Sequence, residues 1–232
     1  MIEKNLNQLC GKTLSHLATS GAYAGVLHQT VIQPLEQLTA QAADQGFDLR
    51  IVSGFRSFER QLRIWNGKAT GDRDLLNNDS EVVDVSRLSE LELTHAILRW
   101  SALPGASRHH WGTDFDVYDA AAVSEDYVVQ LTPEETQGSG PFARMHRWLD
   151  AVLPTTDFYR PYDEDRGGVA PEPWHLSYRP LADQYAKQLS PATVLCALKQ
   201  GELLVGERIK VALHDCVSEN IKDIYDRFIM SA

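Results

Sequence analysis

Apolar residues recur at the three- and four-residue spacing of an amphipathic helix in several stretches of this chain. The first such stretch, residues 4–18, predicts a helix with an apolar face made of Leu6, Leu9, Leu14 and Leu17. Further helices are predicted over residues 30–45, 57–67, 88–100 and 141–153, and from about residue 180 to the C-terminus with a break near 201–206. The chain is therefore expected to be mainly helical.

Several expected helix boundaries follow from residues that start or end helices. Pro34 and Pro141 fit the first turn of a helix, where a missing backbone N–H costs no hydrogen bond. Gly46 can adopt the left-handed conformation that ends a helix. Ser57 is placed to cap the helix that begins in SFERQLRIWNG, with Arg60 where a capping box usually has Glu.

Three shorter stretches have the pattern of strands. Residues 47–54 (FDLRIVSG) alternate and lead into a turn, and residues 111–119 (WGTDFDVYD) alternate over a longer run. Residues 171–178 (PEPWHLSY) predict a short third strand. Few strands among many helices favour an α+β fold, with a small antiparallel sheet flanked by helices.

Two polar stretches separate these elements. Residues 67–87 are rich in turn-forming residues and are expected to form a surface loop that could act as a lid. Residues 156–170 are expected to be irregular. Since the sequence contains no clear linker, we expect one domain over residues 1–180, N-terminal helices included, and a helical C-terminal extension over residues 181–232 that packs on it. The acidic extension is expected to be a solvated cap over the core or a dimer surface.

The charge of the chain restricts its partners. The 232 residues carry a formal net charge of −10 at pH 7, and the sequence pI is about 5.2. Nucleic acids and anionic membranes attract basic surfaces, so neither is expected as a partner. A small anionic substrate remains compatible with this charge if a few arginines lie near its binding site.

The cysteines and the N-terminus indicate the compartment. Cys10, Cys196 and Cys216 are too few and too scattered for a disulfide framework, and we expect buried free thiols in a reducing environment. Polar residues interrupt the N-terminal stretch where a signal peptide would be continuously apolar, and no segment is apolar over membrane-spanning length. The protein is therefore expected to be cytoplasmic.

Residues 107–117 (SRHHWGTDFDV) and 172–175 (EPWH) gather side chains that bind metals. A catalytic zinc site needs three His or carboxylate ligands and one open position for water. His109, Asp116 and His175 supply three such ligands from two predicted strand regions. Zinc lowers the pKa of a water in the open position to about 7, and Glu172 is close enough in sequence to His175 to accept the proton.

These segments resemble the zinc peptidases that group lysostaphin, D-Ala-D-Ala carboxypeptidases and the hedgehog fold. SRHHWGTDFD fits the pattern S-x-H-x-x-G-x-A-x-D, and EPWH fits E-x-W-H. SGFRSFERQ, residues 53–61, is similar to the S-G-[YF]-R-[ST]-x-x-x-Q stretch of the VanY-like carboxypeptidases. The three motifs occur in the order of that family and anchor residues 47–180.

The resemblance implies zinc as the cofactor and a peptidoglycan peptide that ends in D-alanine as the substrate. It implies His109, Asp116 and His175 as the zinc ligands. It also implies Glu172 as the general base that passes the proton of water to the leaving amine.

Three further residues receive roles from the same resemblance. Arg56 is implied to polarise the scissile carbonyl and stabilise the oxyanion, and Gln61 and Ser107 to hold the C-terminal D-alanine. Electrostatics agrees for Arg56, because an acidic protein needs a fixed cation wherever a substrate carries or develops negative charge.

The sequence departs from the family pattern at Asp114, where Ala is usual. On a strand, Asp114 and Asp116 point to the same face, so the alternation alone leaves either able to reach a metal. The motif favours Asp116. We expect Asp114 to lie behind the ligands and pair with Arg108 or His110.

Two classes of function fit these observations. An active zinc carboxypeptidase is expected, because Glu172 is present with all three ligands; the alternative is an inactive binding module with the same fold. Among enzymes, an L,D-carboxypeptidase of muropeptide recycling is favoured over a D,D-carboxypeptidase, a D,D-dipeptidase or a cross-link endopeptidase.

Overall fold

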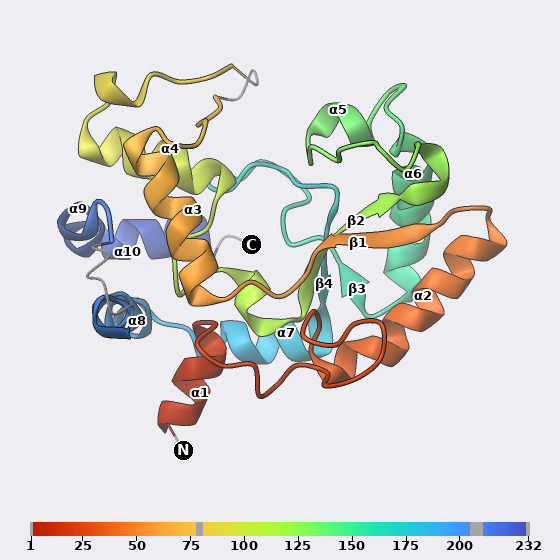
Figure 1. Ribbon diagram of the computed structural model, residues 1–232, viewed down its shortest axis with the longest axis horizontal. Helices are drawn as coiled ribbons and strands as arrows, with labels where there is room; N and C mark the ends of the chain where they lie inside the picture. The colour runs from red at the N-terminus through yellow and green to blue at the C-terminus, as the bar shows by residue number, and fades with distance from the viewer. Residues whose placement is uncertain (1, 78–80, 205–210, 231–232) are drawn as a thin grey trace.

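The computed structural model describes residues 2–77, 81–204 and 211–230, and side chains are described from residue 6 to residue 200 within these ranges and again from residue 211. Its centre is an antiparallel sheet in which the described strands are ordered β1-β2-β4-β3 (Figure 1). The strands are β1 (Leu49–Ser53), β2 (Asp114–Asp119), β3 (Phe158–Tyr159) and β4 (His175–Tyr178). This arrangement confirms the predicted α+β fold with a small antiparallel sheet.

Two helices pack beside the sheet and form one core with it (Figure 1). These are α2 (Ile32–Asp44) and α6 (Ala143–Val152). Leu35 and Leu149 are buried in the same apolar cluster as Phe115 and Leu176 of the central strands. Burial of such side chains stabilises the fold by about 1.5–3 kcal/mol each, so this core fixes the strands that carry the candidate ligands.

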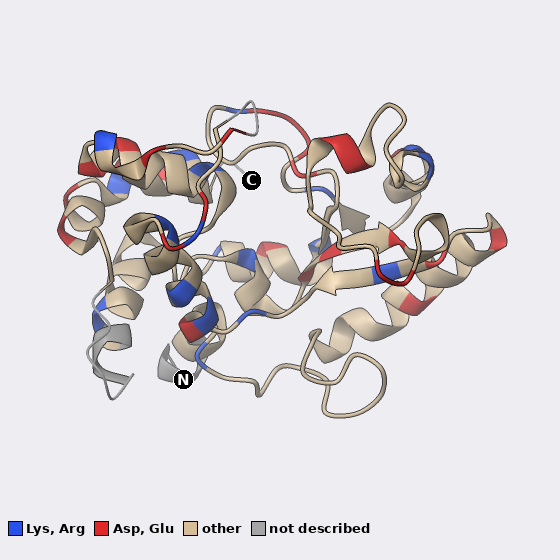
Figure 2. Ribbon diagram, turned by 45° about the horizontal axis from the view of Figure 1, so that its top comes forward, with Lys and Arg blue, Asp and Glu red and all other residues tan. Residues whose placement is uncertain are grey.

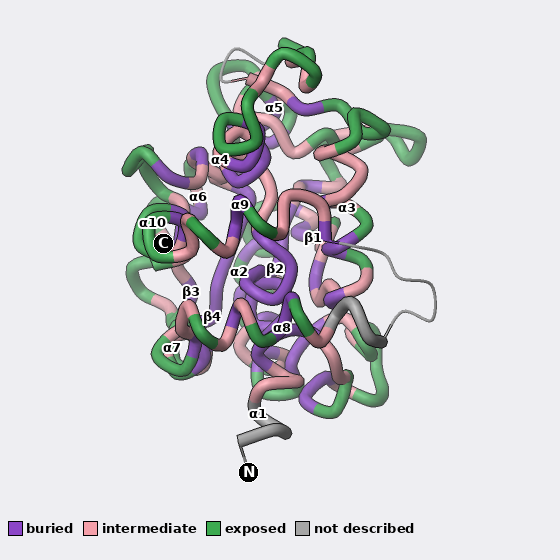
Figure 3. Tube along the Cα trace, turned by 90° about the vertical axis from the view of Figure 1, so that its left-hand side faces the viewer, coloured by how far each residue is buried: buried purple, intermediate pink, exposed green. Residues whose placement is uncertain are grey.

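Most of the remaining helices form a second core on the other side of the site. Its members include Trp65, Ile97, Trp111 and Leu198, from helices spread along the whole chain. Figure 3 shows most buried segments toward the middle of the molecule and most exposed segments on its outer turns. The elements around this core are α1 (Ile2–Leu9), α3 (Phe58–Thr70), α4 (Glu90–Trp100), α7 (Arg179–Ala186), α8 (Pro191–Leu204), α9 (His214–Glu219), α10 (Ile221–Ile224) and a final π-helical turn (Tyr225–Ile229).

The predicted helix over residues 4–18 was wrong in its second half. Helix α1 ends at Leu9, and Gly11 adopts a left-handed φ of 71° that turns the chain. A Cβ at Gly11 would lie 2.3 Å from Nδ1 of His110. Leu14 is exposed, and Leu17 pairs with His28 as an isolated bridge. Leu6 and Leu9 therefore lie on helix α1, whereas Leu14 and Leu17 lie beyond the turn and only by chance keep the helical spacing.

Other element boundaries in the structure also differ from the predicted ones. Helix α3 ends at Thr70, three residues beyond the predicted helix end at Gly67. Within the predicted loop 67–87, Leu76 forms a bridge with Val82. The stretch 156–170 contains β3, and the C-terminal helices are interrupted at residues 187–190, which the sequence did not indicate. Helix α8 continues to Leu204 without the break expected from residue 201, and residues 205–206 lie outside the described part.

The C-terminal segment shares the second core. Ala182, Val194 and Phe228 belong to the same buried cluster as Trp65 of α3. Acidic and basic residues lie on helices at both sides of the sheet (Figure 2).

Cys10 and Cys216 are buried free thiols as expected, whereas Cys196 is exposed on α8, which corrects the expectation for that residue. In the described part of the chain, every helix falls short of the length and apolarity required to cross a membrane.

Candidate metal centre

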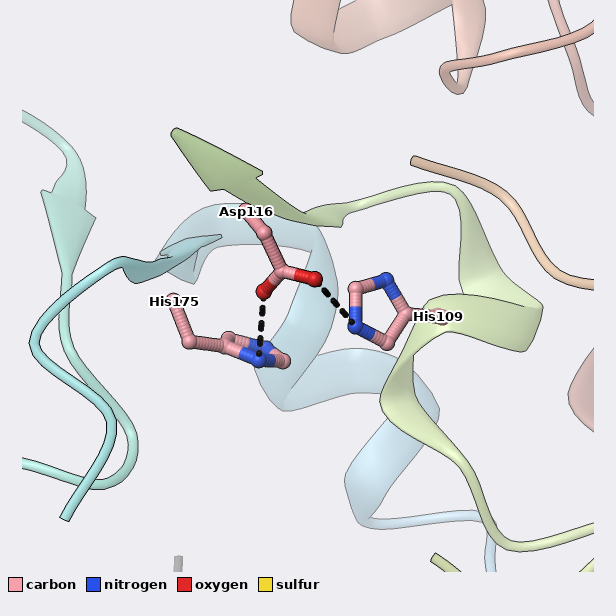
Figure 4. Close-up of side chains that lie close together, drawn as sticks. All are labelled: His109, Asp116 and His175. Carbon is pink, nitrogen blue, oxygen red and sulfur yellow. Dashed lines mark ion pairs between the residues drawn. The ribbon is translucent and has the colours of Figure 1, made fainter. Parts of the chain in front are cut away.

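Three side chains from three neighbouring elements converge on one point (Figure 4). His109 lies on the 3-10 turn Arg108–Trp111, Asp116 on β2 and His175 at the start of β4. All three are buried, and one ligand atom from each can be chosen so that all lie within 4.8 Å of one another. The structure thus brings together the His109, Asp116 and His175 predicted from the sequence.

The sheet register and one glycine explain this convergence. Asp116 and His175 are directly paired across β2 and β4. Gly112 has a left-handed φ of 65° and ends the 3-10 turn of His109 just before β2. A Cβ at Gly112 would lie 2.6 Å from a methyl carbon of Leu17 and 2.8 Å from the backbone nitrogen of His28. Glycine is therefore required where the motif has it.

The hydrogen bonds of the two histidines leave one ring nitrogen of each for a metal. Nδ1 of His109 donates a hydrogen bond to the carbonyl of Gly54 at 3.0 Å, which leaves Nε2 facing Asp116. Nε2 of His175 donates a hydrogen bond to the Asp114 carboxylate at 3.1 Å, which leaves Nδ1 facing Asp116 and Glu172. When the outer nitrogen carries the proton, the ring nitrogen that faces inward has a free lone pair that can bind a metal.

The donor set fits zinc, and each histidine nitrogen lies near tetrahedral spacing from one of the two oxygens of Asp116. Zinc bonds to N and O ligands are about 2.0–2.2 Å long, so neighbouring ligand atoms of a tetrahedron lie roughly 3.4 Å apart. Oδ2 of Asp116 is 3.5 Å from Nε2 of His109, and Oδ1 of Asp116 is 3.4 Å from Nδ1 of His175. Among the described residues, Oδ1 of Asp116 and Nδ1 of His175 are buried without a hydrogen-bond partner. A bound cation would satisfy both atoms.

Asp114 lies behind His175 and away from the point of convergence. Its Oδ1 accepts a hydrogen bond from Nε of Arg108 at 2.7 Å, and its Oδ2 accepts one from the Thr113 hydroxyl at 2.6 Å. Burial works to raise the pKa of Asp114, but Arg108 and His175 hold that pKa below its ordinary range. The expected pairing with Arg108 is therefore present, and Asp114 is an ionised partner that orients His175.

Burial and neighbouring charge shape the protonation of the candidate ligands. Burial raises the pKa of Asp116, against the attraction of His175. Burial works against the charged form of His175, but the neighbouring carboxylates of Asp114, Glu172 and Asp116 raise its pKa to about 9. In the metal-free protein a proton therefore occupies this cluster of carboxylates, and a metal must displace it.

Glu172 stands beside the three candidate ligands at the edge of a cavity of about 280 Å³. Its Oε2 lies 3.2 Å from Nδ1 of His175, and its side chain is 15% exposed. The backbone N–H of Glu172 donates to the carbonyl of Tyr162, and the Tyr162 ring packs edge-on against His175. Glu172 can therefore reach both the metal site and a molecule in the cavity.

Arg56 lines the same cavity and is fixed by its neighbours. Its Nη1 donates to Gln61 at 2.9 Å and its Nη2 to Ser53 at 3.2 Å. Its backbone carbonyl accepts from Nδ1 of His110 at 2.6 Å, since Nε2 of His110 accepts from the N–H of Gly105. Among the described residues, the buried Nε of Arg56 has no partner. Nε–H is therefore among the donors of this fixed guanidinium that remain for a ligand.

Gln61 and Ser107 occupy different positions relative to the cavity. The Gln61 side chain is buried, accepts from Arg56 and donates to the carbonyl of Ala102 at 2.6 Å. Its contacts position Arg56. Ser107 lines the cavity beside His109. Trp174 is buried and also forms part of the cavity wall.

The cavity has two walls of different construction. We call the turn 108–111 with β2 and β4 the metal wall, and residues 74–77 with residues 130–133 the loop wall. In the loop wall, the carboxylate of Glu135 accepts backbone N–H groups from Gln130, Leu131 and Thr132 and the hydroxyl of Tyr127. Leu131 is held with a left-handed φ of 57°.

Residues 74–77 of the loop wall belong to the stretch 67–87 that was predicted as a loop that could act as a lid. Sequence reasoning missed residues 130–133 and one cation, Lys68 of α3, which also lines the cavity. The Thr132-Pro-Glu-Glu135 stretch is a capping box at the start of α5 (Pro133–Thr136), and this local signal could have indicated the Glu135 contacts. The position of Lys68 depends on how α3 packs, which no local pattern reveals.

These features define a class of protein. Three buried ligands with an open side, an adjacent carboxylate and a fixed guanidinium in one cavity are the parts of a hydrolase that uses a metal ion to activate water. The sequence model of the VanY family, described as D-alanyl-D-alanine carboxypeptidase, matches residues 25–181. That span is more than half of the chain and contains every candidate site residue, so the chain belongs to the VanY family. The protein is a zinc metallopeptidase.

Similar proteins include two from Haemophilus influenzae, each described as an uncharacterized protein. One is 34% identical over 130 residues, which are 55% of this chain and 93% of that protein. The other is 38% identical over 98 residues, which are 41% of this chain and 67% of that protein.

Solved structures with a similar fold include VanYB in complex with D-alanine-D-alanine and the LD-carboxypeptidase LdcB. VanYB is 22% identical, with a TM-score of 0.47 over 70% of this chain and 78% of that chain. LdcB is 17% identical, with a TM-score of 0.49 over 77% of this chain and 78% of that chain.

Proposed function

We propose that the protein removes one C-terminal D-alanine from peptidoglycan peptides and acts mainly on tetrapeptides, as a cytoplasmic L,D-carboxypeptidase of muropeptide recycling. The observation that carries the proposal is the convergence of His109, Asp116 and His175 beside Glu172 and Arg56 in one cavity. This arrangement supplies the parts that hydrolysis of a terminal amide bond requires.

Each protein residue has a distinct task in this reaction. Zinc, held by the three ligands, supplies the Lewis acidity that activates water and polarises a carbonyl. Glu172 accepts a proton from water while the water oxygen attacks the carbonyl carbon. Glu172 then delivers that proton to the leaving amine of D-alanine. Arg56 donates from its free Nε to the carbonyl oxygen as negative charge develops there.

The preference for tetrapeptides rests on the expected cytoplasmic location. A peptidase in that compartment meets wall precursors and recycled wall fragments. Removal of D-alanine from precursors would interfere with wall synthesis, whereas recycled fragments are largely tetrapeptides with a single terminal D-alanine. The bond to that residue starts from the L-centre of the third residue, so its hydrolysis is an L,D-carboxypeptidase reaction.

A D,D-carboxypeptidase that acts on pentapeptides is the second candidate. The family description supports it, because it names D-alanyl-D-alanine carboxypeptidase. The two candidates share the metal centre, Glu172 and Arg56, and they differ in the residue that precedes the scissile bond.

Separate incubation with a tetrapeptide and a pentapeptide distinguishes the two candidates. We expect the zinc-loaded protein to release one alanine from the tetrapeptide and to cleave the pentapeptide poorly, with products identified by mass. Efficient conversion of pentapeptide to tetrapeptide that stops there would establish the D,D activity and reject the first proposal. Glu172→Gln is the matched control, because it removes the proposed base and leaves the three ligands in place.

A further inference from the structure

Among the described residues, three Lys or Arg side chains line the cavity, and two of them are engaged with other residues. Arg108 binds the Asp114 carboxylate, and Arg56 binds Gln61 and Ser53. The third is Lys68. Within the described part of the chain, no hydrogen bond or ion pair reaches the Lys68 ammonium group. Lys68 is therefore the cavity cation whose charge is free to meet a ligand.

The position of Lys68 places this charge near the reacting groups. Lys68 lies in the last turn of α3 and is half-buried, and Arg56 lies just before the start of the same helix. Burial lowers the pKa of Lys68 to about 8, while the charge of Glu172 raises it and those of Arg56 and Arg73 lower it further. At neutral pH the side chain is mostly charged, and a half-buried charge without a partner is costly to maintain.

The proposed substrate creates two demands for positive charge. A peptide with a free C-terminus brings a permanent carboxylate, and hydrolysis adds negative charge at the scissile carbonyl oxygen. The guanidinium of Arg56 is assigned to the carbonyl. Gln61 carries no charge and is not among the residues that line the cavity, and its amide holds Arg56 and the carbonyl of Ala102.

We propose that the Lys68 ammonium group binds the terminal carboxylate of the substrate peptide and selects for a free C-terminus. This inference rests on the proposed function. An interior peptide bond offers no carboxylate to Lys68, so the residue favours carboxypeptidase over endopeptidase activity. Lys68 is thus a specificity-determining residue that lies outside all three sequence motifs.

The test compares matched substrates across four proteins. The substrates are a tetrapeptide that ends in D-alanine and the same peptide that ends in D-alaninamide. The proteins are wild type, Lys68→Gln, Lys68→Arg and the control Arg63→Gln, which removes an exposed charge of α3 outside the cavity. For each pair, kcat and KM are measured with the zinc-loaded protein.

We expect Lys68→Gln to raise KM for the free acid about 10- to 100-fold, the effect of losing a charged hydrogen bond, with a smaller change in kcat. On the amide, Lys68→Gln and wild type should be equal. Lys68→Arg should retain most of the affinity, and Arg63→Gln should match wild type. For wild type, KM for the acid should rise above about pH 8, and Lys68→Arg should shift that rise to higher pH.

Two results would overturn the inference. One is an equal loss on acid and amide, which would mean a structural effect of the substitution. The other is a Lys68→Gln effect that appears with diaminopimelate but not lysine as the third residue, which would assign Lys68 to the side-chain carboxylate of the substrate.

A binding measurement separates this inference from the proposed function. The Kd values of the acid and the amide are measured by calorimetry in the Glu172→Gln background, with and without Lys68→Gln. If wild type shows no turnover, the proposed function fails, but a preference for the acid that disappears in the double variant still supports Lys68. If wild type is active and Lys68→Gln leaves this preference unchanged, only the inference about Lys68 fails.

Discussion

The metal wall of the cavity is made of two strands and a 3-10 turn, whereas the loop wall is made of segments that follow α3 and precede α5. In the metal wall, His109, Asp116 and His175 are buried and held by sheet pairing and by hydrogen bonds to Gly54 and Asp114. In the loop wall, the backbone at 130–132 is held by one buried carboxylate, Glu135. The first wall fixes the chemistry, and the second shapes the space that the substrate enters.

This difference predicts that damage to the metal wall abolishes function and damage to the loop wall adjusts it. The largest effect is expected for His175→Ala, which removes a ligand from the centre. Zinc content should fall from about one equivalent per chain to nearly none, and activity should disappear with it. Metal analysis of protein purified without chelator checks this outcome. Full zinc retention in His109→Ala, Asp116→Ala and His175→Ala alike would contradict the site.

The next effect concerns the Arg56 guanidinium, which lines the same cavity. Arg56→Ala should lower kcat by about 100- to 1000-fold, the scale for loss of one oxyanion donor, and should leave zinc content unchanged. Steady-state kinetics together with metal analysis of the same preparation measure both quantities. A loss of zinc that parallels the loss of activity would mean that Arg56 holds the site together and does not act on the carbonyl.

A smaller effect on zinc binding is expected for Asp114, which lies behind the ligand His175. Asp114→Ala should keep zinc but weaken its binding about 10- to 100-fold, because His175 loses the partner that orients it. It should also destabilise the protein by about 3–5 kcal/mol, since the buried Arg108 loses its counter-charge. Competition with a chelator and chemical denaturation measure the two effects. If Asp114→Ala loses the metal while Asp116→Ala keeps it, the assignment of the ligand is wrong by two residues.

The smallest effect is expected in the loop wall. Glu135→Gln removes the charge that accepts three backbone N–H groups, so the loop wall should loosen at a cost of about 1–3 kcal/mol. KM should rise several-fold, with zinc content unchanged and kcat changed little. The exposed neighbour Glu134 provides the matched control, Glu134→Gln. A loss of zinc in Glu135→Gln would show that the two walls depend on each other.

The contrast between the walls also explains what the sequence could predict. The residues of the metal wall lie in compact motifs whose spacing follows from a turn, a glycine and two paired strands, so His109, Asp116, Glu172 and His175 could be found together. The predicted strands and most helix starts were confirmed because capping residues and alternation are local signals. Lys68 has no such signal, because its place depends on long-range packing of α3.

Errors in the predicted elements have the same physical origin. The leucines of residues 4–18 keep helical spacing, but the tight approach of Gly11 to His110 requires the chain to turn there. β3 is only two residues long and pairs with β4 from a polar stretch. In both cases a tertiary contact decided the local conformation.

Glu172 provides the most direct test of the central claim, that the three ligands hold zinc for a reaction in which Glu172 moves the proton. The measurement is zinc content and turnover of the tetrapeptide in wild type and in Glu172→Gln. The account predicts about one zinc in both proteins and a loss of turnover of about 100-fold or more in the variant. Near-normal turnover in a zinc-loaded Glu172→Gln protein would contradict it.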